Sequence, residues 1–526
     1  MNNIALPKLI VWGVTVLALP FAMLLGSWIG EGRTRELLIM VGLSILGILL
    51  LWIPQWLWVF AIGSMFVPGQ LPFLPLPFKP MELFLLLLLA RFVVEDVVFK
   101  KRWIKLGPSP DSFFIIGLLI VMLWHGFHDR FAMRSLGSLV WGGRNYFSMM
   151  LGFSAYFMLQ STSLNQKPFR HLPSIILAFG FIDFLFNLIV FLMPHLGGTL
   201  SSFYGDATAN SGELFARRLG FAGNFGYLLI FWSLSDCRFQ DFLHKGRLVK
   251  ASVFCLGFML CAASGYRSSL IIAAIITAVA AFRDFRFGAI FMLIPVSLAF
   301  SALIGLHLSG IKLPVTIQRG LVWVPGAGWD EAATADATGS DEFRGEVWDL
   351  WLKTEFPRHP ILGRGFGLNY EDMIATLPFL SEEGAGTAWL SKYNRNEAFV
   401  VSGNVHHGFF STVDRFGLIG GLCFIFWTFY ILRRMFMELA ASRNAPMNPA
   451  LQWLSLYVIS FTIGFPFGAL RAENFLPQQL ILCGLFTALL AASKSSSSKS
   501  QPGTSSLKKP APAPRLNPIR PPAILR

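Results

Sequence analysis

Charged residues are scarce in this chain, and their scarcity decides its class. Only 14% of the 526 residues are Asp, Glu, Lys or Arg, whereas 54% are hydrophobic and 15% are aromatic. The mean hydropathy is +0.58. Soluble domains are about a quarter charged. The composition therefore excludes an ordinary soluble protein and predicts a membrane protein.

Cysteine is rare too, and the motifs of several enzyme classes are missing. The chain has five cysteines, which fall in apolar stretches or in loops that we place on the inner side of the membrane. We therefore expect no disulfide framework and no cysteine-based metal site. No Asp-x-Asp, Gly-x-Ser-x-Gly or Gly-Lys-Ser/Thr sequence occurs. These absences remove the signals of a metal–nucleotide transferase site, a nucleophile elbow and a P-loop, and we predict neither a metal nor a cofactor.

Long apolar stretches are present instead. A helix needs about 17–25 apolar residues to cross a bilayer, and fewer where it is broken or re-entrant. The sequence therefore predicts an all-α fold, a polytopic bundle of transmembrane helices with about 12–14 spans. The candidate spans are Leu9–Trp28, Leu37–Ile53, Trp56–Val67, Met81–Val94, Phe113–Phe127, Tyr146–Leu159, Ile175–Met193, Leu219–Leu234, Ala251–Ala263, Ser268–Phe282, Phe287–Leu306, Gly408–Leu432, Leu451–Phe467 and Phe475–Ala492.

Lysine and arginine are dense in alternate loops and in the C-terminal tail, which sets the predicted orientation. The positive-inside rule places these loops, the tail and both termini in the cytoplasm, and the polar block Ser309–Val405 outside. We divide the chain into an N-terminal bundle (1–308), one large outer loop (309–405), C-terminal helices (406–492) and a basic cytoplasmic tail (493–526) that we expect to be disordered. Because the formal charge of +14 lies next to the membrane, we expect membrane lipids as partners and not nucleic acid.

Short motifs stand out where the predicted spans meet the outer face. One of them, a histidine pair followed by two glycines, lies where the chain re-enters the membrane. The motifs are Arg218-Leu-Gly-Phe-x2-Asn224, Ser264-Gly-Tyr-Arg267-Ser-Ser, Arg344-x3-Trp348, His359-Pro360-Ile-Leu-Gly363-Arg364-Gly365 and His406-His407-x9-Gly417-x-x-Gly420.

In order, spacing and predicted side, these motifs resemble those of the O-antigen ligase and polymerase superfamily of bacterial membrane glycosyltransferases, over roughly Arg217–Gly421. His407 departs from the ligase pattern, which has Asn, Ser or Gln there. The resemblance implies a GT-C-like, metal-independent, inverting glycosyltransferase of the bacterial inner membrane, whose large loop is periplasmic. It would move a glycan from undecaprenyl pyrophosphate to a lipid A-core sugar in lipopolysaccharide biosynthesis. The alternative is an O-antigen or exopolysaccharide polymerase, which passes the glycan to another lipid-linked repeat unit.

The candidate site residues fit that chemistry. A leaving pyrophosphate needs cations, and a guanidinium group binds phosphate oxygens in pairs. An acceptor hydroxyl needs a base, and a partly neutral imidazole can supply one. We therefore take His406 as catalytic, expect His407 and Asn224 to line the site, and assign the pyrophosphate to Arg218, Arg267, Arg344 and Arg364. The alternatives are structural, namely a histidine that caps a helix and arginines that extend to lipid headgroups.

A transporter or flippase is the rival from another class, since an anionic lipid would also need cations on the outer side. Transporters commonly carry internal repeats. The chain shows no second copy of the Arg267 or His406 motif. We therefore favour an enzyme.

Within the outer loop, residues 346–356 alternate charged and bulky apolar side chains at helical spacing. The pattern predicts an amphipathic helix. We expect it to lie on the membrane surface as a lid, with Trp348 and Trp351 as its anchors.

Overall fold

The computed structural model describes residues 53–67, 78–93, 95, 110–128, 143–162, 164–196, 219–286, 301–302, 304–367, 395–403, 405–442, 447–467 and 471–499. Every regular element in these ranges is a helix, so the predicted all-α class is confirmed for the described part of the chain. The predicted spans Leu9–Trp28, all but the last residue of Leu37–Ile53 and most of Phe287–Leu306 lie outside the described residues, as do residues 500–526 of the predicted tail. Residues 493–499, which we expected to be disordered, instead form the end of helix α20 (Ala472–Lys499), because they continue the preceding apolar helix.

Among the described helices, four are long and apolar enough to cross a membrane. They are α8 (Leu172–Leu192), α12 (Arg267–Phe285), α18 (Gly408–Ala441) and α20 (Ala472–Lys499). Other helices occupy the remaining predicted spans in these ranges, namely α3 (Pro54–Gly63), α4 (Pro80–Phe92), α5 (Pro110–His128), α6 (Gly143–Ser161), α10 (Gly220–Leu234), α11 (Leu248–Ala263) and α19 (Pro449–Gly464). The apolar helices are compatible with a membrane protein.

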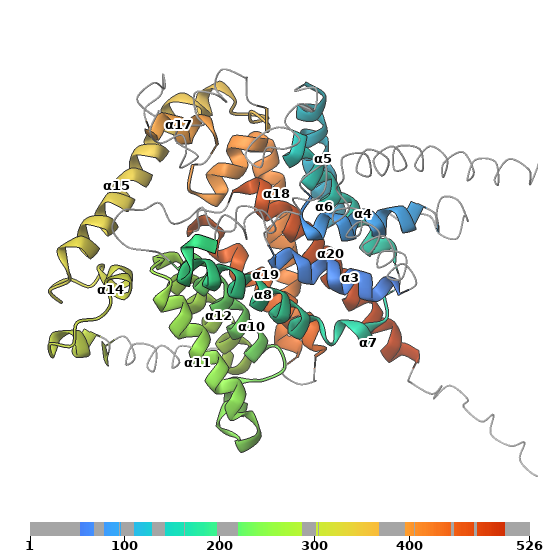
Figure 1. Ribbon diagram of the computed structural model, residues 1–526. Coiled ribbons are helices and arrows are strands. Elements are labelled where there is room, and N and C mark those ends of the chain that lie inside the picture. Colours follow the sequence, from blue (N-terminus) through green and yellow to red (C-terminus); the bar gives the residue numbers. More distant parts are fainter. Residues whose placement is uncertain are drawn as a thin grey trace, which may run out of the picture.

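The helices form two groups beside the central helices α18, α19 and α20 (Figure 1). In the first group α10, α11 and α12 pack on one another, and α12 also packs on α19. In the second group α6 packs along α20, α4 packs on α6, and α5 packs along α18. The core therefore runs through the middle of the bundle, where α19 packs on the first group and α18 and α20 pack on the second.

Small residues allow the closest helix contact in the first group. A Cβ on Gly226 of α10 would lie 2.6 Å from the carbonyl oxygen of Gly257, and a Cβ on Gly257 of α11 would lie 2.7 Å from the carbonyl oxygen of Gly226. Neither position accepts a side chain unless the helices separate. Such small-residue contacts are typical of membrane helices, whose association depends on close packing.

Helix α18 is broken at Gly417, the first glycine of the histidine motif. Gly417 has φ 65° and ψ −172°, a conformation that removes the helical hydrogen bonds across it. The N–H groups of Leu418 and Ile419, which would donate to carbonyl groups four residues earlier, donate instead to the carbonyl oxygens of Pro360 and Ile361, at 2.9 and 3.1 Å. The motif His359–Gly365 of the predicted outer loop, called the outer-loop motif below, thus enters the break.

The carbonyl groups released by the break are paired as well. Those of Asp414 and Arg415 accept hydrogen bonds from the N–H groups of Arg364 and Gly365, at 2.9 and 3.0 Å. An unpaired buried backbone group costs about 1–3 kcal/mol. The exchange of two helical bonds for four bonds to the outer loop therefore stabilises the break, and it joins two motifs that are far apart in the sequence.

The helices of the predicted outer loop are α14 (Val315–Leu321), α15 (Glu331–Thr354) and α17 (Arg395–Val401). In Figure 1, α15 extends along one side of the molecule, with α14 near its beginning and α17 near its end. Residues 346–354 of the helix predicted over residues 346–356 are therefore the last part of a longer one, which ends at Thr354.

The two tryptophans of α15 anchor this helix to protein, which corrects the expectation that they anchor it in the membrane surface. The Trp351 side chain is buried, and its Nε1 donates to Oδ1 of Asp414 at 2.8 Å. Nε1 of Trp348 donates to the carbonyl oxygen of Val405 at 2.8 Å. Both indole N–H groups thus bind α18 or the residues just before it, because buried indoles need a hydrogen-bond partner.

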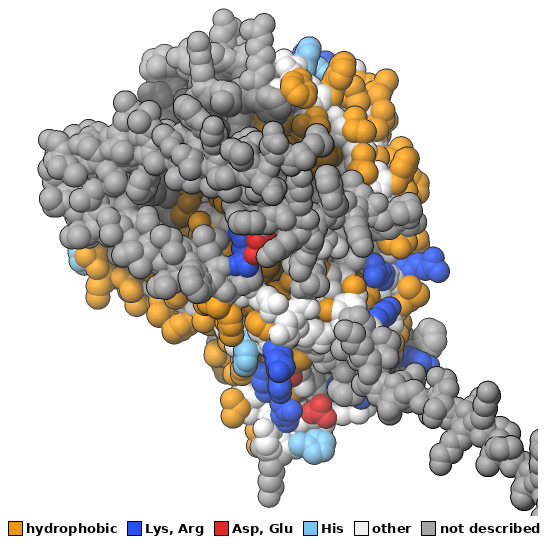
Figure 2. Space-filling model, turned by 90° about the vertical axis from the view of Figure 1, so that its right-hand side faces the viewer, with side chains coloured by type: hydrophobic (Ala, Val, Ile, Leu, Met, Phe, Trp, Pro, Cys, Tyr) orange, Lys and Arg blue, Asp and Glu red, His pale blue; other side chains and the backbone are white. Residues whose placement is uncertain are grey.

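Apolar side chains remain exposed on several helices of the bundle. Figure 2 shows one face, where hydrophobic side chains gather at the upper right and lysines and arginines lie farther down. The largest exposed apolar side chains of α5 and α18 include Phe113, Phe127, Phe426 and Phe429. An apolar surface of this kind is expected where helices face lipid.

Candidate functional site

A cavity of about 630 Å³ lies between α12, α14, α15 and the start of α18. This volume is in the range of roughly 300–1,000 Å³ that ligand sites commonly have. Four of the residues chosen from the sequence meet there, although they come from three different parts of the chain. The charged and aromatic residues of the lining are Arg267, Trp323, Asp341, Arg344, Trp348, His406 and His407.

Asp341 holds the two cavity arginines together. Nη1 and Nη2 of Arg267, the first residue of α12, donate to the two carboxylate oxygens of Asp341 at 2.8 and 2.7 Å. Nη1 of Arg344, one turn along α15, donates to Oδ1 of the same carboxylate at 3.2 Å. The carboxylate therefore makes the paired contact that a phosphate group makes with a guanidinium. It marks the place where two arginines face one anion.

Arg319 of α14 fixes the turn that leads into Arg267. Its Nη1 donates to the carbonyl oxygen of Gly265 at 3.2 Å, and its Nη2 donates to Oγ of Ser340 at 3.0 Å. It also forms an ion pair with Asp336 of α15. Gly265 has φ +76°, a left-handed conformation that favours glycine. One buried side chain thus sets the position of α15 relative to the start of α12.

His406 lies at the cavity in a strained backbone conformation. Its φ of 49° is positive, which costs a residue other than glycine on the order of 1 kcal/mol. Its ring contacts those of Phe343 and Phe399, with centroids 5.5 and 5.3 Å apart. The imidazole is therefore held between an aromatic residue of α15 and one of α17. Strain of this kind is frequent at functional sites.

His407 has a different role, because it caps α18. Its Nδ1 accepts a hydrogen bond from the N–H of Phe410 at 3.2 Å. Its ring stacks on that of Phe410 with centroids 4.2 Å apart and meets the edge of Trp348 at 5.3 Å. Burial lowers the pKa of His407 from its ordinary value. The neutral ring, which alone can accept this bond at Nδ1, is therefore favoured.

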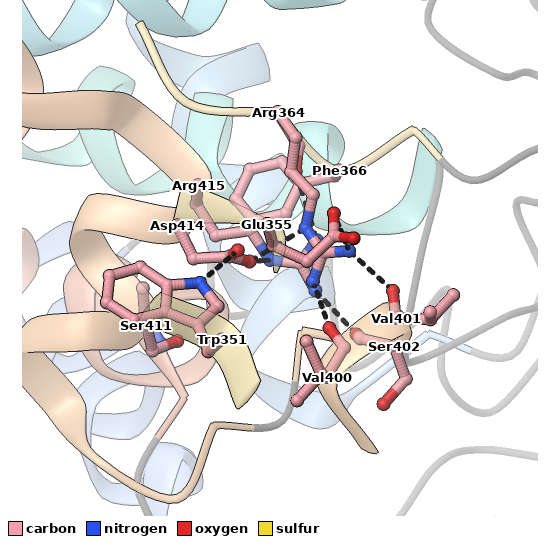
Figure 3. A network of polar contacts seen from close by, with 12 residues as sticks. Trp351, Glu355, Arg364, Phe366, Val400, Val401, Ser402, Ser411, Asp414 and Arg415 are labelled. Atoms are coloured by element: carbon pink, nitrogen blue, oxygen red, sulfur yellow. Dashed lines mark hydrogen bonds and ion pairs between the residues drawn. The ribbon is translucent and has the colours of Figure 1, made fainter. Parts of the chain in front are cut away.

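Arg364 lies outside this cavity, in a buried network beside the break in α18 (Figure 3). Its Nε donates to Oδ2 of Asp414 at 2.8 Å. Its Nη1 and Nη2 donate to the carbonyl oxygens of Val401 and Val400, at 2.6 and 2.8 Å. All three guanidinium nitrogens thus bind protein, and they tie the end of α17 to α18.

Arg415 completes this network from the next position of α18. Its Nη1 and Nη2 donate to the carbonyl oxygens of Gly365 and Ser402, at 3.0 and 2.8 Å. Its guanidinium carbon lies 5.5 Å from the ring centroid of Phe366, and Nη2 lies 3.9 Å from Oε1 of Glu473. Arg415 is almost fully buried. The pair Arg364–Arg415 therefore holds the outer-loop motif in the break.

The other two residues chosen from the sequence are elsewhere. Asn224 of α10 lines a second, smaller cavity between α8, α10, α19 and α20. Arg218 lies outside the described residues. The structure thus brings together Arg267, Arg344, His406 and His407, and it separates Arg364 and Asn224 from them.

Sequence reasoning missed Asp341, Arg319 and the pair Asp414–Arg415. Asp414 and Arg415 did carry a signal, since two charges side by side at the start of an apolar stretch need buried partners. Asp341 and Arg319 carried none that separates them from other charged residues of a polar loop. Their partners become visible only in three dimensions.

Within the described residues, no group of three or more His, Cys, Asp or Glu side chains is close enough to hold a metal ion. No protein-family model matches the chain, and no curated protein matches it at a significant level of similarity.

Proposed function

We propose that this protein is a GT-C-like membrane glycosyltransferase that moves a glycan from undecaprenyl pyrophosphate to an acceptor hydroxyl on the periplasmic face of a bacterial inner membrane. The observation that carries the proposal is the cavity at which Arg267, Arg344 and His406 meet. It combines a paired anion contact with an imidazole, the two groups that this transfer needs.

The reaction assigns one task to each group. The acceptor oxygen attacks the anomeric carbon of the donor sugar, and the bond from this carbon to the pyrophosphate oxygen breaks. Undecaprenyl pyrophosphate leaves with both electrons of that bond, and the acceptor proton passes to the imidazole of His406. Arg267 and Arg344 stabilise the charge that develops on the leaving group, as preorganised cations do in a site sheltered from water.

Asp341 competes with the donor pyrophosphate for the guanidinium group of Arg267. Its carboxylate binds the forked guanidinium of Arg267, so the pyrophosphate must displace it before Arg267 can contact phosphate oxygens. Asp341 itself is half exposed, and an exposed ion pair contributes about 0–1 kcal/mol. A dianionic or trianionic pyrophosphate therefore has a weak contact to replace.

His406 is a better base than His407 on geometric grounds. Nδ1 of His407 accepts the capping hydrogen bond of α18, so proton uptake at this atom would remove the cap. We therefore assign His407 to packing and to lining the site. Arg364, whose guanidinium is used by protein, is left out of the proposed donor site, and Asn224 is left out because it faces another cavity.

Transfer of a labelled glycan tests the proposal. The purified chain is reconstituted in vesicles with a labelled glycan on undecaprenyl pyrophosphate and with EDTA, and it is offered lipid A-core or a second lipid-linked repeat unit. We expect label on lipid A-core, the ligase outcome of lipopolysaccharide biosynthesis, and release of undecaprenyl pyrophosphate. Label on the second repeat unit would make the protein a surface-polysaccharide polymerase. Movement of the intact donor between leaflets without transfer would overturn the proposal in favour of a flippase.

A further inference from the structure

A second cavity lies within the helical bundle, away from the histidines. It has a volume of about 190 Å³ and lies between α8, α10, α19 and α20. Its lining includes Asn224, which belongs to the Arg218–Asn224 motif of the sequence. A motif residue that does not reach the first cavity thus has a place in the second.

The deep part of this cavity contains a carboxylate in the most apolar of the four candidate spans. Asp183 lies near the middle of α8, is only 7% exposed and lines the cavity. Its Oδ1 accepts a hydrogen bond from Nδ2 of Asn187, one turn farther along the helix, at 3.1 Å. Ionisable residues inside membrane helices are costly and mark functional sites. The position of Asp183 in a cavity wall is therefore a reason to look for a ligand.

The polar groups of the cavity suit hydroxyl groups. Asn224, Asn474 and Gln478 each bring a carboxamide, which donates and accepts hydrogen bonds as a sugar hydroxyl does. Asn224 and Asn474 are exposed, whereas Asp183 is buried, so the carboxamides lie at the open end and the carboxylate lies deeper. Hydrogen-bond donors and hydrogen-bond acceptors thus both line this small cavity.

The charge of the lining excludes an anion. No lysine, arginine or histidine is among the described residues that line this cavity, and Asp183 would repel a phosphate. The pyrophosphate of the donor therefore does not belong here. A neutral group, or a cation, fits the electrostatics.

Aromatic rings supply flat apolar contact beside these polar groups. Tyr457 and Phe461 of α19 stack with centroids 4.5 Å apart, and Tyr227 of α10 meets Phe461 edge to face at 5.6 Å. All three line the cavity. The volume equals about six water molecules at the ~30 Å³ that each occupies in the liquid, which is room for one sugar ring.

We propose that the cavity between α8, α10, α19 and α20 binds one neutral sugar unit, held by Asp183 and the carboxamides of Asn224 and Asn474 against the rings of α19. The assignment rests on the proposed function for the origin of the sugar, which is a unit of the glycan or of its acceptor. The binding chemistry itself rests only on the residues of the cavity.

Direct binding tests the inference without any transfer reaction. The full chain, in lipid nanodiscs, is titrated with three methyl glycosides, a hexoside, a 2-acetamidohexoside and a 6-deoxyhexoside, and with ethanolamine as a cationic probe. Saturation-transfer NMR reports which probe contacts the protein. We expect at least one glycoside to bind and ethanolamine to give no signal.

Variants connect the signal to the cavity. Asn474→Leu removes a carboxamide at the exposed end of the cavity. Asp183→Asn replaces the buried carboxylate by a carboxamide of nearly the same shape, so it removes the charge alone. Loss of one hydrogen bond to a charged group corresponds to roughly a tenfold weaker Kd, and loss of one between neutral groups to less. We therefore expect glycoside binding to weaken about tenfold in Asp183→Asn and about fivefold in Asn474→Leu. Asp349→Asn, at an exposed position of α15 outside the linings of both cavities, is the control and should leave glycoside binding unchanged.

Each outcome decides something. Glycoside binding that neither variant weakens, or binding of ethanolamine alone, overturns the sugar assignment. His406→Ala should slow transfer by about 10²–10⁴ but keep glycoside binding. Glycoside binding by a protein that shows no transfer would retain this inference and refute the proposed function, and transfer without glycoside binding would do the reverse.

Discussion

Gly363 and Gly417 lie with their main chains in contact, since a Cβ added to either one would come within 2.4 Å of the backbone nitrogen of the other. Both also have positive φ, at +77° and +65°. A side chain is therefore excluded at both positions by space and by conformation. This contact is where the outer-loop motif meets the break in α18.

Gly417→Ala should accordingly reduce the amount of folded protein. The added methyl group would come within 2.1 Å of the Ile361 carbonyl oxygen, and overpacking costs about 1–3 kcal/mol. Thermal unfolding of the purified protein measures the loss. Gly339→Ala is the matched control, because Gly339 is exposed on α15 with nothing within 4 Å of a Cβ and alanine is the better helix former. Equal stability of the two variants would contradict the close contact between Gly417 and residues 361–363.

Arg267→Lys should slow glycan transfer about 10- to 100-fold while it leaves the protein folded. Lysine keeps the charge but lacks the fork that holds two oxygens at once. The measurement is kcat/KM for the lipid pyrophosphate donor. Arg433→Lys, at an exposed position far along α18, should change nothing. A fully active Arg267→Lys enzyme would assign the arginine to lipid headgroups.

Asp341→Asn should lower the KM for the donor several-fold. The change removes the carboxylate that competes for Arg267 and Arg344, and it costs about 0–1 kcal/mol of stability because the pair is partly exposed. Steady-state kinetics with varied donor concentration provide the measurement. A raised KM would mean that Asp341 orients Arg267 for the donor instead of competing with it.

His406→Ala and His407→Asn should differ sharply. Loss of a general base costs about 10²–10⁴ in rate, so His406→Ala should fall by this factor in kcat. Asparagine is a good helix cap, so His407→Asn should keep both the start of α18 and the transfer rate. His407→Ala, which lacks a cap, should lose about 1 kcal/mol of stability. A dead His407→Asn enzyme with an active His406→Ala enzyme would exchange the two roles.

The cap also predicts a pH dependence of stability. Burial lowers the pKa of His407 below its ordinary value of 6.5, so the folded chain resists protonation there more than the unfolded chain does. The contribution is complete above the ordinary pKa and is lost as the pH falls through the lowered one. We expect the Tm of the wild type to fall more steeply below about pH 6 than that of His407→Asn. Parallel curves would show that the cap does not titrate.

The sequence could predict the position of those site residues that lie at the ends of predicted membrane spans. Arg267 and His406 each stand at the start of a predicted apolar helix on the same side, so their meeting follows from topology. Arg344 joined them because its spacing to Trp348 puts both on one helix, whose helical pattern is visible in residues 346–356.

Arg364 and Asn224 show where this reasoning stops. The partners of Arg364 are a carboxylate fifty positions away and two main-chain carbonyl groups, and a carbonyl group has no sequence signature. Asn224 is one turn into α10, and its rotation about the helix axis decides which cavity it faces. Rotation depends on packing against α8 and α11, which the apolar pattern of an almost wholly apolar helix does not reveal.

The joint in α18 has a mechanical consequence. Main-chain bonds attach both sides of the break to residues 360–365, through Asp414 and Arg415 before Gly417 and through Leu418 and Ile419 after it. Any displacement of residues 360–365 is therefore passed to both halves of α18 at once, including the first turns that begin beside the histidines. Second-site suppressors of Gly417 variants should accordingly arise at residues 361–363, which are far from Gly417 in sequence and in direct contact with it in space.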